Sequence, residues 1–117
     1  MASKRSIGTT NEYSVIDYLA SQGCRVILHS FSPFHSYEVD IIAYDEGTLA
    51  FVEVKSVVNK GWDESNIAHL VNNLKRDKIR KVALYFIENS LLPYKDVRFD
   101  VAFRNGSKIT YYKGCSL

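Results

Sequence analysis

The sequence feature that most limits the fold is a pair of apolar, β-branched segments on either side of a turn. Residues 38–44 and 48–58 consist mostly of valine, isoleucine, alanine and similar side chains, and Asp45-Glu46-Gly47 lies between them. Turn-forming residues between two such segments predict an antiparallel β-hairpin. If Glu46 and Gly47 are the two central turn residues, the register of the whole hairpin is fixed.

In that register, four ionisable residues share one face at the open end of the hairpin. Asp40 lies opposite Glu53 and Glu38 lies opposite Lys55, because side chains alternate between the two faces along each strand. Charged groups at the end of an otherwise buried hairpin are costly without compensation. The other face is apolar, and its pairs are Val39 with Val54, Ile41 with Val52, and Ala43 with Ala50.

The opposed carboxylates of Asp40 and Glu53 predict a metal site. They repel each other, and a divalent cation between them relieves the repulsion. Mg²⁺ or Mn²⁺ suits one or two carboxylates, with water and substrate phosphate as further ligands. Such an ion activates water and stabilises charge on a phosphodiester, and Lys55 could orient that water or neutralise the phosphate. The simpler alternative is a Glu38–Lys55 salt bridge with Asp40 and Glu53 in solvent, and a bulge would rearrange the pairs.

The rest of the chain predicts an α/β fold. Apolar residues at helical spacing begin after Thr9-Thr10-Asn11-Glu12 and stop at Gly23, which predicts a helix, and Cys24–Leu28 predicts a strand that leads into a Ser- and Pro-containing loop over 30–36. A second helical stretch starts at Asp63 or Ser65 and runs to Ile87, with an internal break as an open alternative. Strands over 97–104 and 108–112 flank Asn105-Gly106, a strong hairpin signal. We therefore expect one domain over residues 1–117, in the order αβββαββ, with a mixed sheet of about five strands flanked by two helices.

Composition limits the class of protein without naming a partner. Fifteen Lys and Arg against 13 Asp and Glu give a net charge of +2, too slight a bias to indicate a polyanion. Cys24 and Cys115 form no CxxC pair, so neither a disulfide framework nor a zinc site is indicated. No secretory signal and no apolar run of membrane-spanning length stands out. We expect a cytoplasmic protein that does not contact a membrane.

The hairpin resembles a known nuclease signature. Glu38-Val39-Asp40 followed by Glu53-Val54-Lys55 is similar to the PD-(D/E)xK motif, and the wider sequence resembles the YraN family of that superfamily, also called UPF0102. The matches, in chain order, are Gly8 and Glu12, Glu38-Val39-Asp40-Ile41-Ile42, Phe51-Val52-Glu53-Val54-Lys55, Lys75 and Lys78, and Arg98-Phe99-Asp100-Val101.

The resemblance implies a restriction-endonuclease-like fold and a set of roles. Asp40 and Glu53 would be metal ligands, Lys55 the catalytic lysine, and Glu12 an acidic residue near the metal, with Mg²⁺ or Mn²⁺ as cofactor. Superfamily relatives include restriction enzymes and Holliday-junction resolvases, so the implied activity is hydrolysis of DNA, including branched or structured DNA.

The chain departs from the family pattern at several positions. Asn11 and Tyr37 replace glycines, Val57 stands where a basic residue often follows, and Ser30-Phe31 replaces an asparagine and a basic residue. These departures favour an alternative, a nucleic-acid-binding module that keeps the nuclease fold and does not cleave. A third hypothesis is an interaction protein with no nucleic-acid role.

Other candidate residues have structural explanations beside functional ones. Glu12 could close a capping box with Thr9, or it could lie at the rim of the core near the sheet. Lys75 and Lys78, within a basic run, are the best candidates for phosphate contacts, although such runs are usually solvated faces. We assign Arg98 and Asp100 an ion pair, Trp62 packing rather than base stacking, and no site to His29, His35 and His69. The last strand could pair with a second copy of the chain to form a homodimer.

Overall fold

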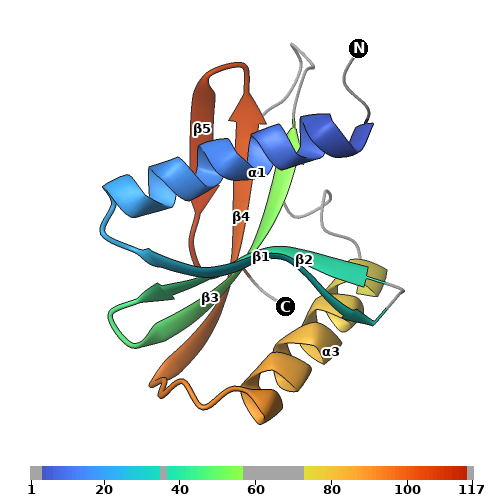
Figure 1. The fold of residues 1–117 in the computed structure, drawn as a ribbon, viewed down its shortest axis with the longest axis vertical. Helices are drawn as coiled ribbons and strands as arrows, with labels where there is room; N and C mark the ends of the chain where they lie inside the picture. The colour runs from blue at the N-terminus through green and yellow to red at the C-terminus, as the bar shows by residue number, and fades with distance from the viewer. Residues whose placement is uncertain (1–3, 35–36, 57–72, 116–117) are drawn as a thin grey trace.

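Five strands lie between two helices in the computed structural model, which describes residues 4–34, 37–56 and 73–115. Figure 1 shows α1 and α3 on opposite sides of the sheet. The elements are α1 (Lys4–Ser21), β1 (Arg25–Phe34), β2 (Tyr37–Asp45), β3 (Thr48–Ser56), α3 (Asn73–Asn89), β4 (Asp96–Asn105) and β5 (Lys108–Tyr112). This is the expected α/β order, αβββαββ. The expected helix start at Asp63 or Ser65, with Trp62, Val57, His35 and His69, lies outside the described residues.

The sheet is mixed, as expected. Its strand order is β1-β2-β3-β4-β5, in which β3 and β4 are parallel and every other neighbouring pair is antiparallel. Parallel neighbours cannot be joined by a tight turn, so the chain must cross over between β3 and β4, and α3 belongs to that connection. Neither helix of the described part is long and apolar enough to cross a membrane.

The β2–β3 turn has the predicted central residues. Glu46 and Gly47 have φ angles of 48° and 94°, the two positive values that a two-residue hairpin turn of type I′ requires. The register expected from this turn is confirmed from Asp45–Thr48 to Ile41–Val52. The ladder ends there, one position before the expected pair of Asp40 with Glu53.

Each face of the sheet carries its own apolar core. On the α1 face, Val15 and Leu19 of the helix pack with Ile41, Ala43, Ala50, Val52 and Ala102. On the α3 face, Val82, Ala83 and Phe86 of the helix pack with Ile42, Leu49 and Phe51, and Ile79 packs with Phe99, Val101 and Phe103. Successive residues of a strand point to opposite faces of the sheet. Because both faces are covered by apolar cores, the strand sequences are near-continuous apolar runs.

The alternation of β2 breaks at Asp40, and this break positions the candidate site. Val39 packs in the α3-side core, whereas Ile41 packs in the α1-side core two residues later. The expected pairing of Val39 with Val54 on one apolar face is therefore wrong. β1 is irregular next to this point. Ser30 lies between the residues that pair with Ile41 and Val39, and it has a left-handed φ of 54°. The register is the same on both sides of this point, since His29 pairs with Ile41 and Phe31 with Val39, so the break in alternation is separate from the register shifts of β1. A sequence-derived register cannot include such a break.

Three boundaries differ from expectation. α1 begins at Lys4, so Thr9 and Glu12 lie inside the helix and the capping box is wrong. β1 continues to Phe34, through the segment expected to be a loop. The last hairpin pairs Asn105 with Lys108, so its two turn residues are Gly106 and Ser107, with Gly106 at a φ of 60°.

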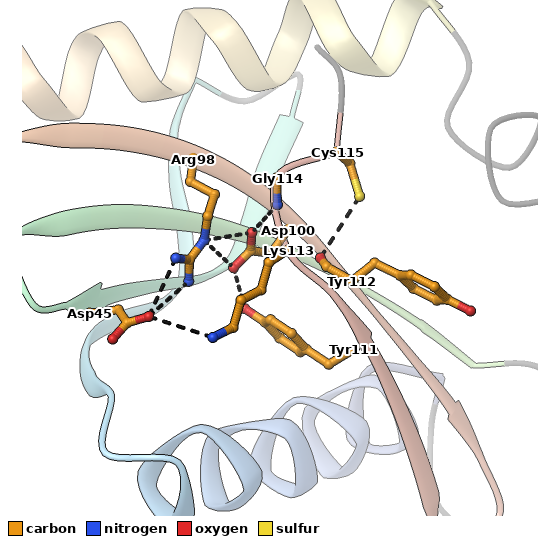
Figure 2. Close-up of polar contacts among 8 residues, drawn as sticks. All are labelled: Asp45, Arg98, Asp100, Tyr111, Tyr112, Lys113, Gly114 and Cys115. Carbon is orange, nitrogen blue, oxygen red and sulfur yellow. Dashed lines mark hydrogen bonds and ion pairs between the residues drawn. The ribbon is translucent and has the colours of Figure 1, made fainter.

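Arg98 and Asp100 form the expected ion pair within β4, at the centre of a larger polar network on the α1 face of the sheet (Figure 2). The fully buried Asp100 accepts hydrogen bonds from Arg98 Nε at 2.9 and 3.0 Å, from the Tyr111 hydroxyl at 2.6 Å and from the Gly114 N–H at 2.9 Å. The guanidinium of Arg98 also donates to Asp45 at 3.3 Å. Every bond satisfies a charge that would otherwise be costly to bury, so the network fastens β5 and the β2–β3 turn to β4.

We predict that Tyr111→Phe lowers the free energy of unfolding by about 2 kcal/mol, because it removes a hydrogen bond to a buried charged group. Urea titration followed by circular dichroism measures this change. Tyr94→Phe is the matched control, since Tyr94 is 44% exposed and the change should cost less than about 0.5 kcal/mol. Equal stability of Y111F and wild type would contradict a stabilising role for the network.

Candidate functional site

Three carboxylates converge where the alternation of β2 breaks. Glu12 of α1 is buried, Glu38 of β2 is exposed and Asp40 of β2 is half-buried. One oxygen from each lies within 4.8 Å of the others. We call these residues the acidic cluster. The sequence predicted that Asp40 lies near Glu12, and the irregular backbone at Ser30 and Asp40 makes this approach to the helix possible.

Glu12 is held in place from β1. The Ser30 hydroxyl donates to Glu12 Oε2 at 2.8 Å, and Glu12 is only 7% exposed. Ser30 adopts its left-handed φ at an energetic cost, since L-residues other than glycine, asparagine and aspartate rarely occupy that region. The strained residue thus supplies the polar partner that a buried carboxylate needs.

Asp40 occupies the gap where the β2–β3 ladder ends. Its Oδ2 accepts the backbone N–H of Val54 at 2.7 Å, taking a donor of β3 just past the last ladder pair. Burial raises the pKa of Asp40 to about 8, helped by the negative charge of Glu53 and by the contact with Glu12, while the Val54 hydrogen bond opposes the rise. The surroundings of Asp40 therefore disfavour its charged form.

Glu53 and Lys55 lie together on the α3 face of β3. Glu53 is 6% exposed; its Oε2 accepts the Tyr37 hydroxyl at 2.6 Å, and its Oε1 lies 3.2 Å from Lys55 Nζ. Burial and the Glu53 carboxylate raise the pKa of the Tyr37 phenol, so it stays a proton donor. The sequence-derived register placed Glu38 opposite Lys55. In the structure, Lys55 forms an ion pair with Glu53, and Glu38 belongs to the acidic cluster.

The five predicted residues thus form two adjoining groups. The acidic cluster belongs to the α1 side, and Glu53 with Lys55 belongs to the α3 side. Asp40 joins them through Val54 and through its electrostatic interaction with Glu53. Sequence reasoning missed Ser30 and Tyr37 as partners of the carboxylates, although both had been singled out as departures from the family pattern.

The basic residues predicted for phosphate contact lie on α3. Lys78 is exposed. Lys75 is also in α3, but its side chain lies outside the described part of the chain. Neighbouring Arg80 forms an exposed pair with Asp77 at 3.6 Å, a contact of little energetic value.

The donor set of the acidic cluster fits a hard divalent cation. Carboxylate oxygens are the ligands that Mg²⁺ and Mn²⁺ prefer, and three within 4.8 Å can reach one ion. Burial and the neighbouring carboxylates disfavour the charged form of Asp40 and so raise its pKa. A cation bound at the cluster would stabilise that charged form.

Comparison with known proteins places the chain in a family. The model of an uncharacterised protein family, UPF0102, matches residues 11–103. The chain belongs to UPF0102. The chain is 35% identical over 106 residues to a UPF0102 protein of Thermodesulfovibrio yellowstonii, covering 90% of each chain, and 38% identical over 108 residues to one of Sulfurihydrogenibium, covering 91% of this chain and 90% of the relative. A UPF0102 protein of Solibacter usitatus is 33% identical over 83% of this chain and 75% of its own length. The matched UPF0102 region contains Glu12, Glu38, Asp40, Glu53 and Lys55.

Two substitutions at Ser30 separate strain from hydrogen bonding. Ser30→Ala and Ser30→Gly both remove the bond to Glu12, but only glycine adopts the left-handed backbone without penalty. We predict that S30G is more stable than S30A by about 1 kcal/mol, measured by urea unfolding. Equal stabilities would show that position 30 carries no strain.

The stability of the metal-free protein should depend on pH through Asp40. Its folded pKa lies above its unfolded value, so its stabilising contribution is complete below about pH 4 and is lost as the pH rises toward 8. The difference in unfolding free energy between wild type and Asp40→Asn should therefore fall over this window. Chemical denaturation at several pH values in EDTA tests this, and a constant difference would contradict it.

Proposed function

We propose that this UPF0102 chain is a metal-dependent endonuclease that hydrolyses phosphodiester bonds in DNA. The observation that carries the proposal is the acidic cluster of Glu12, Glu38 and Asp40, with oxygens within 4.8 Å, beside the ion pair of buried Glu53 and partly exposed Lys55. Carboxylates that can hold a divalent ion, next to a lysine ammonium, are the groups that metal-assisted phosphodiester hydrolysis uses.

Asp40 is central to the proposed site because it touches both groups. It would hold the ion together with Glu12 and Glu38, or with Glu53 as the sequence indicates, and Mg²⁺ or Mn²⁺ would supply an activated water and a counter-charge for the phosphate. Ser30 and Val54 fix the orientation of the acidic side chains through their hydrogen bonds. A preorganised set of ligands needs little rearrangement when the ion and substrate bind.

Lys55 would stabilise negative charge on the phosphate. Its ammonium is positioned by Glu53 at 3.2 Å, yet the Lys55 side chain is 28% exposed and can reach a bound substrate. Such a fixed cation stabilises charge that develops in the transition state. Lys78 would contact a neighbouring phosphate of the DNA backbone, and branched or structured DNA is the substrate class that the family resemblance implies.

A cleavage assay tests the proposal. Labelled linear, flap and four-way-junction DNA, incubated with Mg²⁺ or Mn²⁺, should be cut in at least one case. Asp40→Asn and Glu53→Gln should lower the rate by at least about 100-fold, as should Lys55→Ala, because each removes a charge at the reacting centre. Lys108→Ala on β5 is the control and should cleave as wild type does. Equal rates for wild type and D40N would refute the proposal.

One contact favours a second function, a nucleic-acid-binding module that does not cleave. Tyr37 and Lys55 engage the two oxygens of Glu53 separately, so that carboxylate is already satisfied by the protein. This hypothesis predicts salt-sensitive DNA binding with no metal-dependent cutting. Tyr37→Phe distinguishes the two cases: it removes the phenol hydrogen bond to Glu53 Oε2, and cleavage that appears only in Y37F would show that the phenol blocks an otherwise competent site.

A further inference from the structure

A pocket of about 660 Å³ lies between α3 and the part of the β1–β2 hairpin next to the acidic residues. Its volume is within the range of pockets that hold small organic groups. The side chains that line it and carry the argument are Phe34, Tyr37, Lys78, Lys81, Tyr85 and Glu88. We call it the α3 pocket.

Aromatic rings form one wall of the α3 pocket. Phe34 and Tyr85 meet edge to face, with ring centroids 5.3 Å apart and planes at 72°, and each is 39% exposed. Phe31 supports Tyr85 from the core side, at 6.3 Å between centroids. Two partly exposed rings, each held by a neighbouring ring, offer a stable surface on which a planar group can stack.

Two lysines give the pocket a positive side. Lys78 and Lys81 are three residues apart, which places them next to each other on α3, and both are exposed. Glu88 lies further along the helix, and it is the one acidic residue among those that line the pocket. The combination of exposed rings and paired cations matches the chemistry of a nucleotide, whose base stacks and whose phosphate is anionic.

Tyr37 connects the α3 pocket to the proposed reacting centre. Its side chain lines the pocket, and its hydroxyl donates to Glu53 at 2.6 Å. A group in the pocket therefore lies one side chain away from a predicted catalytic carboxylate. A nucleotide held there would be a close neighbour of the phosphate that is cut.

We propose that the α3 pocket holds the base of an unpaired nucleotide next to the scissile phosphate, with the phosphate of that nucleotide on Lys78 and Lys81. This inference rests on the proposed nuclease function and narrows its substrate to nucleic acid that contains unpaired nucleotides, such as flaps, loops and single strands. A paired base must leave its stack before it can reach Phe34 and Tyr85, which costs a few kcal/mol, whereas an unpaired base avoids most of that cost.

The test compares two ligands that carry the same charge and differ in their bases. The probes are a fluorescent oligothymidine of about twelve nucleotides and an abasic strand with the same number of phosphates. Fluorescence anisotropy in EDTA should show that the wild type binds oligothymidine roughly 5- to 100-fold more tightly. Equal affinities, or binding to neither strand, would overturn the proposal.

Variants then locate the preference. Tyr85→Leu and Phe34→Leu keep apolar packing but remove the stacking rings, so they should bring oligothymidine affinity close to that of the abasic strand. Tyr94→Leu, at a tyrosine outside the pocket with 44% exposure, is the control and should keep the wild-type preference. The double variant Lys78→Gln, Lys81→Gln should bind both the oligothymidine and the abasic strand more weakly, and its binding should depend less on salt concentration. An unchanged preference in Y85L and F34L would place base recognition elsewhere and overturn the proposal.

Cleavage measured on the same samples keeps this inference separate from the proposed function. If the base preference depends on Tyr85 and Phe34 but Mn²⁺ produces no cutting, the pocket is supported and the nuclease proposal fails. If Mn²⁺ produces cutting but the preference is absent, the nuclease proposal is supported and the pocket is overturned. D40N should lose cleavage and keep the preference.

Discussion

The structure around the candidate site depends on the shared irregularity of β1 and β2 at Ser30 and Asp40. Regular alternation would send Asp40 to the α3 face, away from Glu12. The irregular backbone instead ends the β2–β3 ladder, lets Asp40 take the Val54 N–H, and sets Ser30 against Glu12. Placing buried Glu12 and half-buried Asp40 so close together is expensive, and these hydrogen bonds offset part of the cost. Destabilising features of this kind are common at functional sites, where the rest of the fold must hold them.

The rest of the fold is suited to hold it. Apolar cores on both faces and the Asp100 network in the middle of β4 give the sheet a rigid frame, from which Asp40, Glu53 and Lys55 project at its open end. The two faces make different contributions. α1 brings a buried carboxylate to the cluster, whereas α3 brings cations and the ring of Tyr85. In the proposed function, the ion and an extended substrate would therefore be held by separate elements.

Much of this could be predicted because local chemistry determines it. Glu46-Gly47 specifies a turn, the turn specifies the register, and the register places Asp40 near Glu53. The sequence could not show that alternation breaks at Asp40, because nothing in the composition of β1 marks Ser30 for a left-handed backbone. Thr9 and Glu12 have the spacing of a helix cap, yet the helix begins earlier, at Lys4, so this local signal does not mark its start. The hydrogen bond from Tyr37 to Glu53 joins two strands, β2 and β3. Tyrosine occurs in too many structural settings for the sequence to predict this partner.

Tyr37 touches two regions that would otherwise be independent. Its ring borders the α3 pocket, and its hydroxyl satisfies Glu53. When one side chain contacts two sites, a ligand that moves this side chain at one site changes the binding free energy of the ligand at the other site. Thermodynamic linkage requires this change in binding free energy to be the same in both directions. Ion affinity would then change on nucleotide binding by the same factor by which nucleotide affinity changes on ion binding. Under the two proposals, the ring of Tyr37 would couple ion binding to nucleotide binding within a single chain.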